Sequence, residues 1–315
     1  MQTVFMFPSQ LSCYAGMWQK LIDFHPPCAD LIAHAADVLN KDLLKEFTNE
    51  RESWFDRNDN LQVAVFLVNA LYEKILHDNN IRTKYSLGFS LGECNHLFHI
   101  GAIDFADMLR FLVYRGRSYE NMETGWKRVA VYPISLSFLE DCIKDREVEI
   151  GGQMSPTASM LVGKPDAIDA CVDDISLFSP QTRIRKLKVD VPIHSRFLSD
   201  SSLKFEKYLE KVPINRTSAP YLPNMTGLYV ENPAESQIRQ YLAQLSSHPV
   251  QWCRSIDTIL NRFGEVKFIE VGAKNLLCRH FQLEPDWKSG INYLFLDDGE
   301  ENSTAQLEKA LKELS

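Results

Sequence analysis

Apolar residues gather near the start of the chain in a short run that predicts a buried strand. The run spans residues 3–7, and Pro8 ends it because proline has no backbone N–H for a sheet. Helical periodicity follows over residues 29–47 and 62–77. Strand and helix patterns alternate in this way as far as Ser90. The alternation predicts an α/β fold in which helices cover a parallel sheet.

The rhythm changes near residue 126, where a second pattern predicts a small inserted domain. Strands and helices then follow in the order β-α-β-β-α-β, which is typical of the ferredoxin-like arrangement. The expected strands span 127–134, 147–151, 158–162 and 183–191, and the expected helices span 137–144 and 166–178. We therefore predict a ferredoxin-like small domain over 126–194, inserted into a large α/β domain formed by residues 1–125 and 195–315.

The chain closes with an amphipathic helix pattern over residues 302–315. Ser303 and Gln306 have the spacing of a capping box, in which each side chain bonds a backbone N–H near the helix start. One face carries Leu307, Leu311 and Leu314. This face is expected to pack on the large domain, and a partner-binding helix is the alternative.

Composition excludes several classes of protein. The 315 residues are 45% hydrophobic and 24% charged, as in ordinary globular proteins. Because 34 basic and 42 acidic residues give a net charge of −8, nucleic-acid binding is not expected. The longest apolar run, residues 63–72, is shorter than the ~20 residues of a membrane helix, so no membrane association is expected. The N-terminus lacks the features of a secretion signal.

Seven cysteines are scattered along the chain, and none forms a C-x-x-C pair. The eight histidines form no H-E-x-x-H pair. These patterns fit free thiols in a cytoplasm better than disulfides or a zinc site. We therefore expect a cytoplasmic protein without a metal centre.

The strongest local motif is a G-x-S-x-G sequence within Gly88-Phe89-Ser90-Leu91-Gly92-Glu93, placed between a strand pattern and a helix pattern. In such an elbow the serine adopts strained backbone angles, and the glycines let neighbouring backbone pass close by. The helix that follows directs free N–H groups at the same point, where they can hold an oxyanion. An ordinary glycine-rich turn before a helix is the alternative interpretation.

A serine needs a base to act as a nucleophile at neutral pH. The downstream candidates are His96, His99, His194, His248 and His280. His96 and His99 lie on the helix that leaves the elbow and are expected on the surface or in packing. His194 lies where the small domain returns to the large one, a position that favours a catalytic group. His248 is the second candidate.

Six stretches carry a resemblance to a known family. They are FMFPSQ at 5–10, LQVAVFLVNALY at 61–72, GFSLGE at 88–93, GAIDFADMLRFLVYRGR at 101–117, VPIHS at 191–195 and HPVQW…FIEVGAK at 248–274. In their order and distances the chain resembles the malonyl-CoA:acyl carrier protein transacylase family, and within it the free-standing acyltransferases that serve polyketide synthases in trans. The resemblance implies an α/β-hydrolase-like large domain with a ferredoxin-like insert, in agreement with the periodicity.

The resemblance also implies catalytic roles. Ser90 corresponds to the nucleophile that takes the acyl group from a thioester, and His194 to the base that accepts its proton and later protonates the departing thiol. Backbone N–H groups of Gln10 and Leu91 correspond to the oxyanion hole. A backbone carbonyl near residues 244–245 is expected to orient the histidine in place of a third acid.

Arg115 corresponds to the arginine that grips the free carboxylate of malonate, and Gln62 to the pocket glutamine. A planar guanidinium meets a carboxylate with two parallel hydrogen bonds, whereas an uncharged acyl chain would leave it unpaired. A solvated arginine on a helix face is the alternative. Phe89 stands in the pocket where the family usually has histidine, and Ile193 where malonyl-selective relatives commonly have phenylalanine. These departures leave malonyl and substituted malonyl units both open.

The expected function is transfer of a malonyl-type group from coenzyme A or an acyl carrier to the phosphopantetheine thiol of an acyl carrier protein, in polyketide or fatty acid synthesis. No cofactor beyond the thioester substrate is expected, and the chain is expected to be a monomer. A proofreading acyl hydrolase on the same scaffold and a catalytically silent docking subunit are the alternatives.

Carrier proteins are usually acidic, so a basic docking patch is also expected. Candidate residues are Arg183, Arg185, Lys186 and Lys188, with Lys127, Arg128 and Arg196 nearby. An ordinary solvated strand is the alternative.

Overall fold

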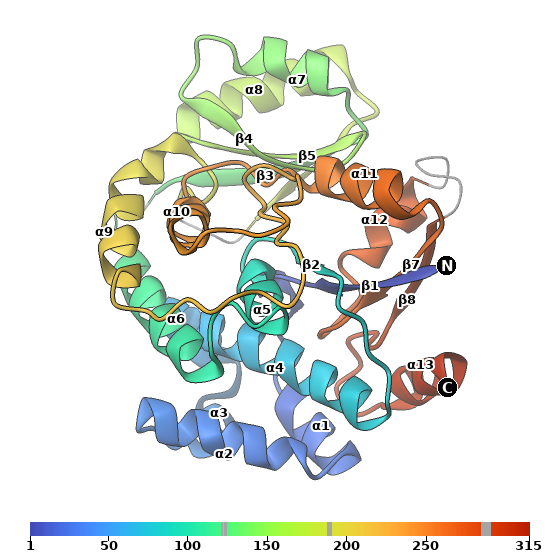
Figure 1. Ribbon diagram of the computed structural model, residues 1–315. Helices are drawn as coiled ribbons and strands as arrows, with labels where there is room; N and C mark the ends of the chain where they lie inside the picture. The colour runs from blue at the N-terminus through green and yellow to red at the C-terminus, as the bar shows by residue number, and fades with distance from the viewer. Residues whose placement is uncertain (121, 123–124, 188–190, 285–290) are drawn as a thin grey trace.

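The computed structural model describes residues 1–120, 122, 125–187, 191–284 and 291–315. Its described strands form two sheets. One is parallel, with the order β2-β1-β7-β8, and the other is antiparallel, with the order β4-β5-β3-β6. Figure 1 shows the antiparallel sheet with two helices above the larger, parallel-sheet part of the molecule.

The parallel sheet is buried between helices on both faces. Its strands are β1 (Gln2–Phe7), β2 (Ser86–Gly88), β7 (Val266–Glu270) and β8 (Ile291–Phe295). Because side chains alternate along a strand, Phe5 and Phe7 join one core cluster whereas Val4 and Met6 join another. The apolar start of the chain therefore forms a central strand, as predicted.

Helices fill the space around this sheet. They are α1 (Met17–Phe24), α2 (Cys28–Leu39), α3 (Leu43–Glu50), α4 (Asn58–Asp78), α5 (Gly92–His99), α6 (Phe105–Glu120), α9 (Ser199–Leu209), α10 (Glu235–Gln244), α11 (Trp252–Phe263), α12 (Cys278–Leu283) and α13 (Ala305–Leu314), with 3-10 turns η1 (Gln10–Ser12), η2 (Arg51–Asp56) and η3 (Arg196–Leu198). Residues 62–73 of α4 are all buried, because this helix packs against neighbours on every side. Within the described ranges, no helix is long and apolar enough to span a membrane.

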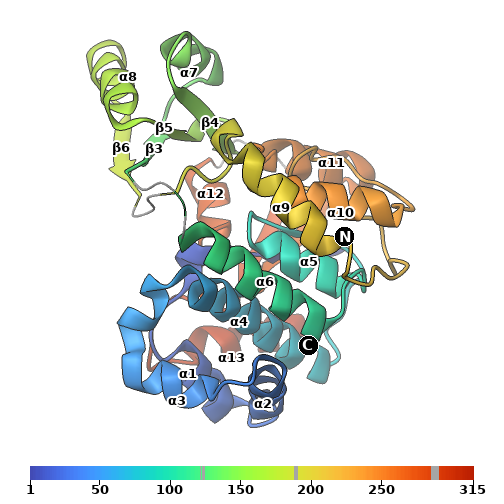
Figure 2. The same ribbon diagram turned by 90° about the vertical axis from the view of Figure 1, so that its left-hand side faces the viewer.

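The antiparallel sheet confirms the predicted order of the insert. Its strands are β3 (Lys127–Tyr132), β4 (Val148–Ser155), β5 (Ala158–Gly163) and β6 (Arg183–Lys186), joined by α7 (Leu136–Ile143) and α8 (Pro165–Phe178). Figure 2 shows both helices on the outer side of this sheet. The predicted α/β class with a ferredoxin-like insert is confirmed, whereas the limits 126 and 194 stay a prediction.

The two faces of β3 contact different parts of the molecule. Val129 and Val131 pack with Ile168 and Ile175 of α8 in a separate core. Arg128 and Ala130 alternate with these valines and so lie on the opposite face of the sheet. That face borders the large part of the molecule and contributes to the cavity described below.

Three details differ from the predicted elements. The helix predicted over 29–47 is two helices, because Asn40 ends α2 in a left-handed conformation at φ 50°. The predicted capping box of Ser303 and Gln306 is wrong, because Thr304 is the N-cap of α13 and Gln306 donates to the carbonyl of Phe295 at 2.8 Å. β6 ends at Lys186, and residues 188–190 of the predicted strand lie outside the described residues. The leucine face of α13 does pack on the large core, as expected.

Candidate active site

Ser90 occupies a sharp turn between β2 and α5. Its backbone φ of +54° lies in the left-handed region. A Cβ added to Gly88 would lie 2.0 Å from the carbonyl of Gly92, and one added to Gly92 would lie 2.0 Å from the carbonyl oxygen of Phe7. Both glycines are therefore required by close backbone approach. The turn has the elbow geometry that the motif predicts.

Ser90 and His194 form a hydrogen-bonded pair. Ser90 Oγ lies 2.6 Å from His194 Nε2, and His194 Nδ1 lies 2.9 Å from the carbonyl oxygen of Leu245. Because Nδ1–H donates to this carbonyl, Nε2 is left as an acceptor for the serine hydroxyl. Leu245 thus supplies the orienting carbonyl that was expected near residues 244–245. The ring of His248 instead contacts Ser247, and only its carbonyl approaches His194 Nδ1, at 3.3 Å.

The imidazole of His194 is held in its neutral form. Burial lowers its pKa to about 3, and the positive charges of Arg128 and Arg115 lower it as well, whereas the two backbone carbonyls act in the opposite direction. The side chain is only 1% exposed. A neutral imidazole can accept a proton from Ser90 at any pH near neutrality.

The rate of Ser90 acylation is expected to stay level as the pH falls from about 8 to about 5. An unperturbed histidine, with a pKa of about 6.5, would lose its function as a base across this range. Since the pKa of His194 is lowered to about 3, the base stays unprotonated. Single-turnover acylation by an acyl thioester at constant ionic strength measures the profile, with melting curves at each pH as the check on folding. A midpoint near 6.5 would contradict the geometry.

Asn224 fixes the peptide groups on both sides of the elbow. Its Oδ1 accepts from the N–H of Ser90 at 2.6 Å, and its Nδ2 donates to the carbonyl of Gly88 at 2.6 Å. Glu93 in turn accepts from the N–H of Asn224 at 2.9 Å and from the hydroxyl of Tyr221. Sequence reasoning did not single out Asn224, because no local motif links it to a turn 134 residues away.

Arg115 is buried beside the pair rather than solvated on its helix. It is 2% exposed, and its Nη1 and Nη2 donate to Gln62 Oε1 at 2.9 Å and Ser246 Oγ at 3.0 Å. The carbonyl of Ser246 accepts from the N–H of His194 at 2.6 Å. Ser246 therefore links the guanidinium to the dyad. The predicted partners Gln62 and Arg115 are brought together at this point.

A cavity of about 350 Å³ opens at Ser90 and His194. The predicted residues Gln10, Phe89 and Ile193 line it. The described residues that line the cavity do not include Gln62, Leu91 or Arg115. Leu91 caps the start of α5, next to the nucleophile. The roles of the Gln10 and Leu91 amides as an oxyanion hole stay a prediction.

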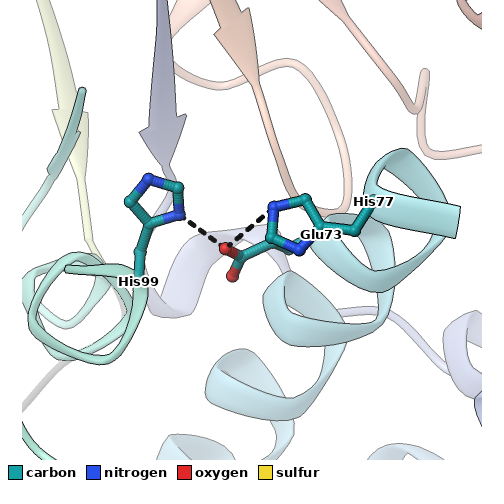
Figure 3. A group of neighbouring side chains, drawn as sticks. All are labelled: Glu73, His77 and His99. Carbon is teal, nitrogen blue, oxygen red and sulfur yellow. Dashed lines mark hydrogen bonds and ion pairs between the residues drawn. The ribbon is translucent and has the colours of Figure 1, made fainter. Parts of the chain in front are cut away.

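A second polar cluster lies on the helices behind the elbow. Figure 3 shows Glu73 of α4 between His77 and His99. Glu73 Oε1 lies 3.7 Å from His77 Nε2 and 2.5 Å from His99 Nδ1. The three could hold a metal ion, since their ligand atoms lie within 4.8 Å of one another. The contacts also join α4 to α5 directly. The expectation that the protein has no metal centre thus stays a prediction.

The predicted basic patch is only partly exposed. Arg183, Arg185 and Lys186 are exposed on β6, whereas Arg128 is buried, which corrects its placement in the patch. Lys127 and Arg196 form ion pairs with acidic residues of the insert, Asp169 and Glu149. Lys188 lies outside the described residues. The docking role of this patch stays a prediction.

Comparison with known proteins relates this geometry to a family. A curated relative, the polyketide biosynthesis malonyl CoA-acyl carrier protein transacylase of Bacillus velezensis, is 29% identical over 277 residues, covering 87% of this chain and 93% of the relative. The crystal structure of malonyl CoA-acyl carrier protein transacylase from Clostridium perfringens has a TM-score of 0.88 at 24% identity, covering 100% of this chain and 97% of the other.

Another similar chain occurs in the complex of a type II polyketide synthase acyl-carrier protein with its malonyl-transacylase, with a TM-score of 0.88, 20% identity and coverage of 99% of this chain and 100% of that one. These likenesses share the fold described above. The family model for the acyl transferase domain matches residues 4–283, a span that includes both the elbow and His194. The chain therefore belongs to the acyl transferase domain family.

Proposed function

We propose that this protein transfers a malonyl or substituted malonyl group from coenzyme A to the thiol of an acyl carrier protein in polyketide biosynthesis. The observation that carries the proposal is the 2.6 Å contact between Ser90 Oγ and His194 Nε2 at the end of a cavity, with the buried Arg115 beside it. The names of the Bacillus velezensis relative and of the carrier-protein complex support the substrate and the partner.

The first half-reaction forms an acyl-serine. His194 Nε2 takes the hydroxyl proton as Ser90 Oγ attacks the thioester carbonyl, and backbone N–H groups of Gln10 and Leu91 hold the oxyanion. The tetrahedral intermediate then collapses, the C–S bond breaks, and the imidazolium gives its proton to the coenzyme A thiolate. The carbonyl of Leu245, which accepts from Nδ1–H, stabilises the imidazolium while it exists.

The second half-reaction reverses these roles. A carrier-protein thiol enters the same cavity and gives its proton to His194 as its sulfur attacks the ester. Ser90 leaves and recovers a proton from the imidazolium. Each step uses only these side chains and the thioester, so the reaction as proposed needs no further cofactor. We also propose that the protein is cytoplasmic, because all seven cysteines are free thiols, as in reducing compartments. We further propose that it acts as a monomer.

Mass spectrometry after mixing with malonyl-CoA tests this function. We expect one malonyl group on the peptide that contains Ser90, stable until a carrier protein with its phosphopantetheine arm is added. Rapid release of free malonate without a carrier protein would favour the acyl hydrolase instead. A protein that gains no mass from malonyl-CoA or acetyl-CoA would be the silent docking subunit.

Replacing Arg115 by alanine is expected to lower malonyl loading by about 10- to 100-fold, and acetyl loading much less. Charge-assisted hydrogen bonds are worth about 1.5–3 kcal/mol, and only the malonyl group has a carboxylate to receive them. Loading rates with both donors measure the selectivity. Arg117→Ala is the matched control, because Arg117 lies on the same helix and pairs with Asp59 at 3.2 Å. Equal losses for both donors would contradict the proposed carboxylate contact.

A further inference from the structure

Arg128 of β3 is a buried cation whose side chain has no oxygen partner among the residues that the structure describes. Its side chain is 7% exposed, and its Nη2 donates to the sulfur of Met160 at 2.7 Å. Its Nε is buried and has no hydrogen-bond partner among the described residues. Thioether sulfur is a weak acceptor, and buried guanidinium groups are normally paired with carboxylates. The structure therefore leaves most of the hydrogen-bonding capacity of this guanidinium unused.

The unpaired guanidinium lines the same cavity as the dyad. Arg128 lies on the face of β3 that borders the large part of the molecule, and its charge contributes to the lowered pKa of His194. Arg185 and Arg279, both exposed, also line the cavity. No aspartate or glutamate occurs among its described lining residues. The described lining thus carries positive charge around the nucleophile and contains no carboxylate to balance it.

Arg128 is freer to receive an anion than Arg115 is. Two of the five N–H groups of Arg115 already donate to the oxygens of Gln62 and Ser246, and Arg115 is not among the described residues that line the cavity. At Arg128 a carboxylate displaces only a sulfur contact. Removing a guanidinium from water is costly, and an incoming anion would offset that cost within the cavity.

We propose that Arg128 binds the free carboxylate of the acyl group, so that the insert's sheet supplies an anchor in addition to Arg115 of α6. This inference rests on the proposed function and assigns the cargo to acyl groups with an anionic end. Without Arg115, Arg128 would still favour such cargo over a neutral chain. Here the structure differs from the expectation drawn from the sequence, which placed Arg128 near an outer docking patch.

Single-turnover loading of Arg128→Met by malonyl-CoA and acetyl-CoA tests the proposal. Methionine keeps much of the volume but removes the charge. We expect malonyl loading to fall by about 10- to 100-fold with acetyl loading unchanged or raised, and Arg128→Lys to recover part of the malonyl rate. Arg146→Met is the control, because Arg146 belongs to the insert but pairs with Asp174 of α8.

Thermal melting separates a binding role from a structural one. An unpaired buried charge destabilises the fold, so Arg128→Met should melt at the same temperature as the parent protein or higher. A lower melting temperature with equal loss for both donors would overturn the proposal, and so would an unchanged malonyl-to-acetyl ratio. If the parent protein loads neither donor, the proposed function fails as well, whereas parent loading with an unaltered Arg128→Met ratio refutes the Arg128 role alone.

Discussion

A Ser90→Ala protein is expected to take up no malonyl group and to lose acyl transfer by about 10⁶-fold, the size of loss seen when a serine enzyme loses its nucleophile. The reason is that both half-reactions pass through the ester on Ser90 Oγ, the oxygen that lies 2.6 Å from His194 Nε2. Alanine carries no oxygen, so no ester can form at this position. Intact-mass measurement after incubation with malonyl-CoA, together with a carrier-protein transfer assay, gives the result.

Ser176→Ala serves as the matched control for this variant. Ser176 is an exposed serine of α8 whose hydroxyl donates only to the carbonyl of Val172, at 2.7 Å. It should load and transfer like the parent protein. Melting curves show whether the Ser90 variant is folded. An adduct that forms on Ser90→Ala at the parent rate would mean that another residue is the nucleophile.

A His194→Ala protein is expected to acylate about 10²- to 10⁴-fold more slowly, the usual contribution of a general base. The serine hydroxyl then has no acceptor for its proton, and the departing thiolate has no donor. Added imidazole should recover part of the rate, because the substitution leaves room beside Ser90. Acylation rates with and without imidazole measure both effects.

His248→Ala provides the comparison for the base. Its ring contacts Ser247 rather than Ser90, and alanine keeps the carbonyl that faces His194. Its loss should therefore be much smaller than that of His194→Ala. A larger loss from His248→Ala, or no response of His194→Ala to imidazole, would argue against His194 as the base.

The elbow was predictable because its motif is local, and its base was predictable because few histidines could serve. The glycines around Ser90 are required by backbone contacts at 2.0 Å, and such requirements appear directly in sequence. Histidine candidates were limited to five, and the position of His194 at a predicted junction favoured it. The family resemblance, and no local pattern, placed the orienting carbonyl near residues 244–245, and the structure assigns it to Leu245.

Other features depend on which surfaces meet, and no short pattern encodes that. Asn224 joins the elbow from a loop far along the chain. The alternation of β3 predicts that Arg128 and Val129 face opposite ways, but not which face borders the large part of the molecule. Arg128 therefore looked like a surface cation although it is buried. The break at Asn40 was missed because the apolar repeat continues on both sides of it.

The cavity at Ser90 and His194 is lined by residues that belong to, or directly follow, strands of two separate sheets. Ser90 follows a strand of the parallel sheet, whereas Arg128, Ala130 and Met160 belong to the antiparallel one. On the proposed function, substitutions on the second sheet are therefore expected to change the preferred acyl group while the backbone of the elbow at Ser90 stays in place. The antiparallel sheet could accordingly be exchanged for that of a relative with another acyl preference, while the segment that holds His194 is kept. We expect such an exchange to change which acyl group the protein loads.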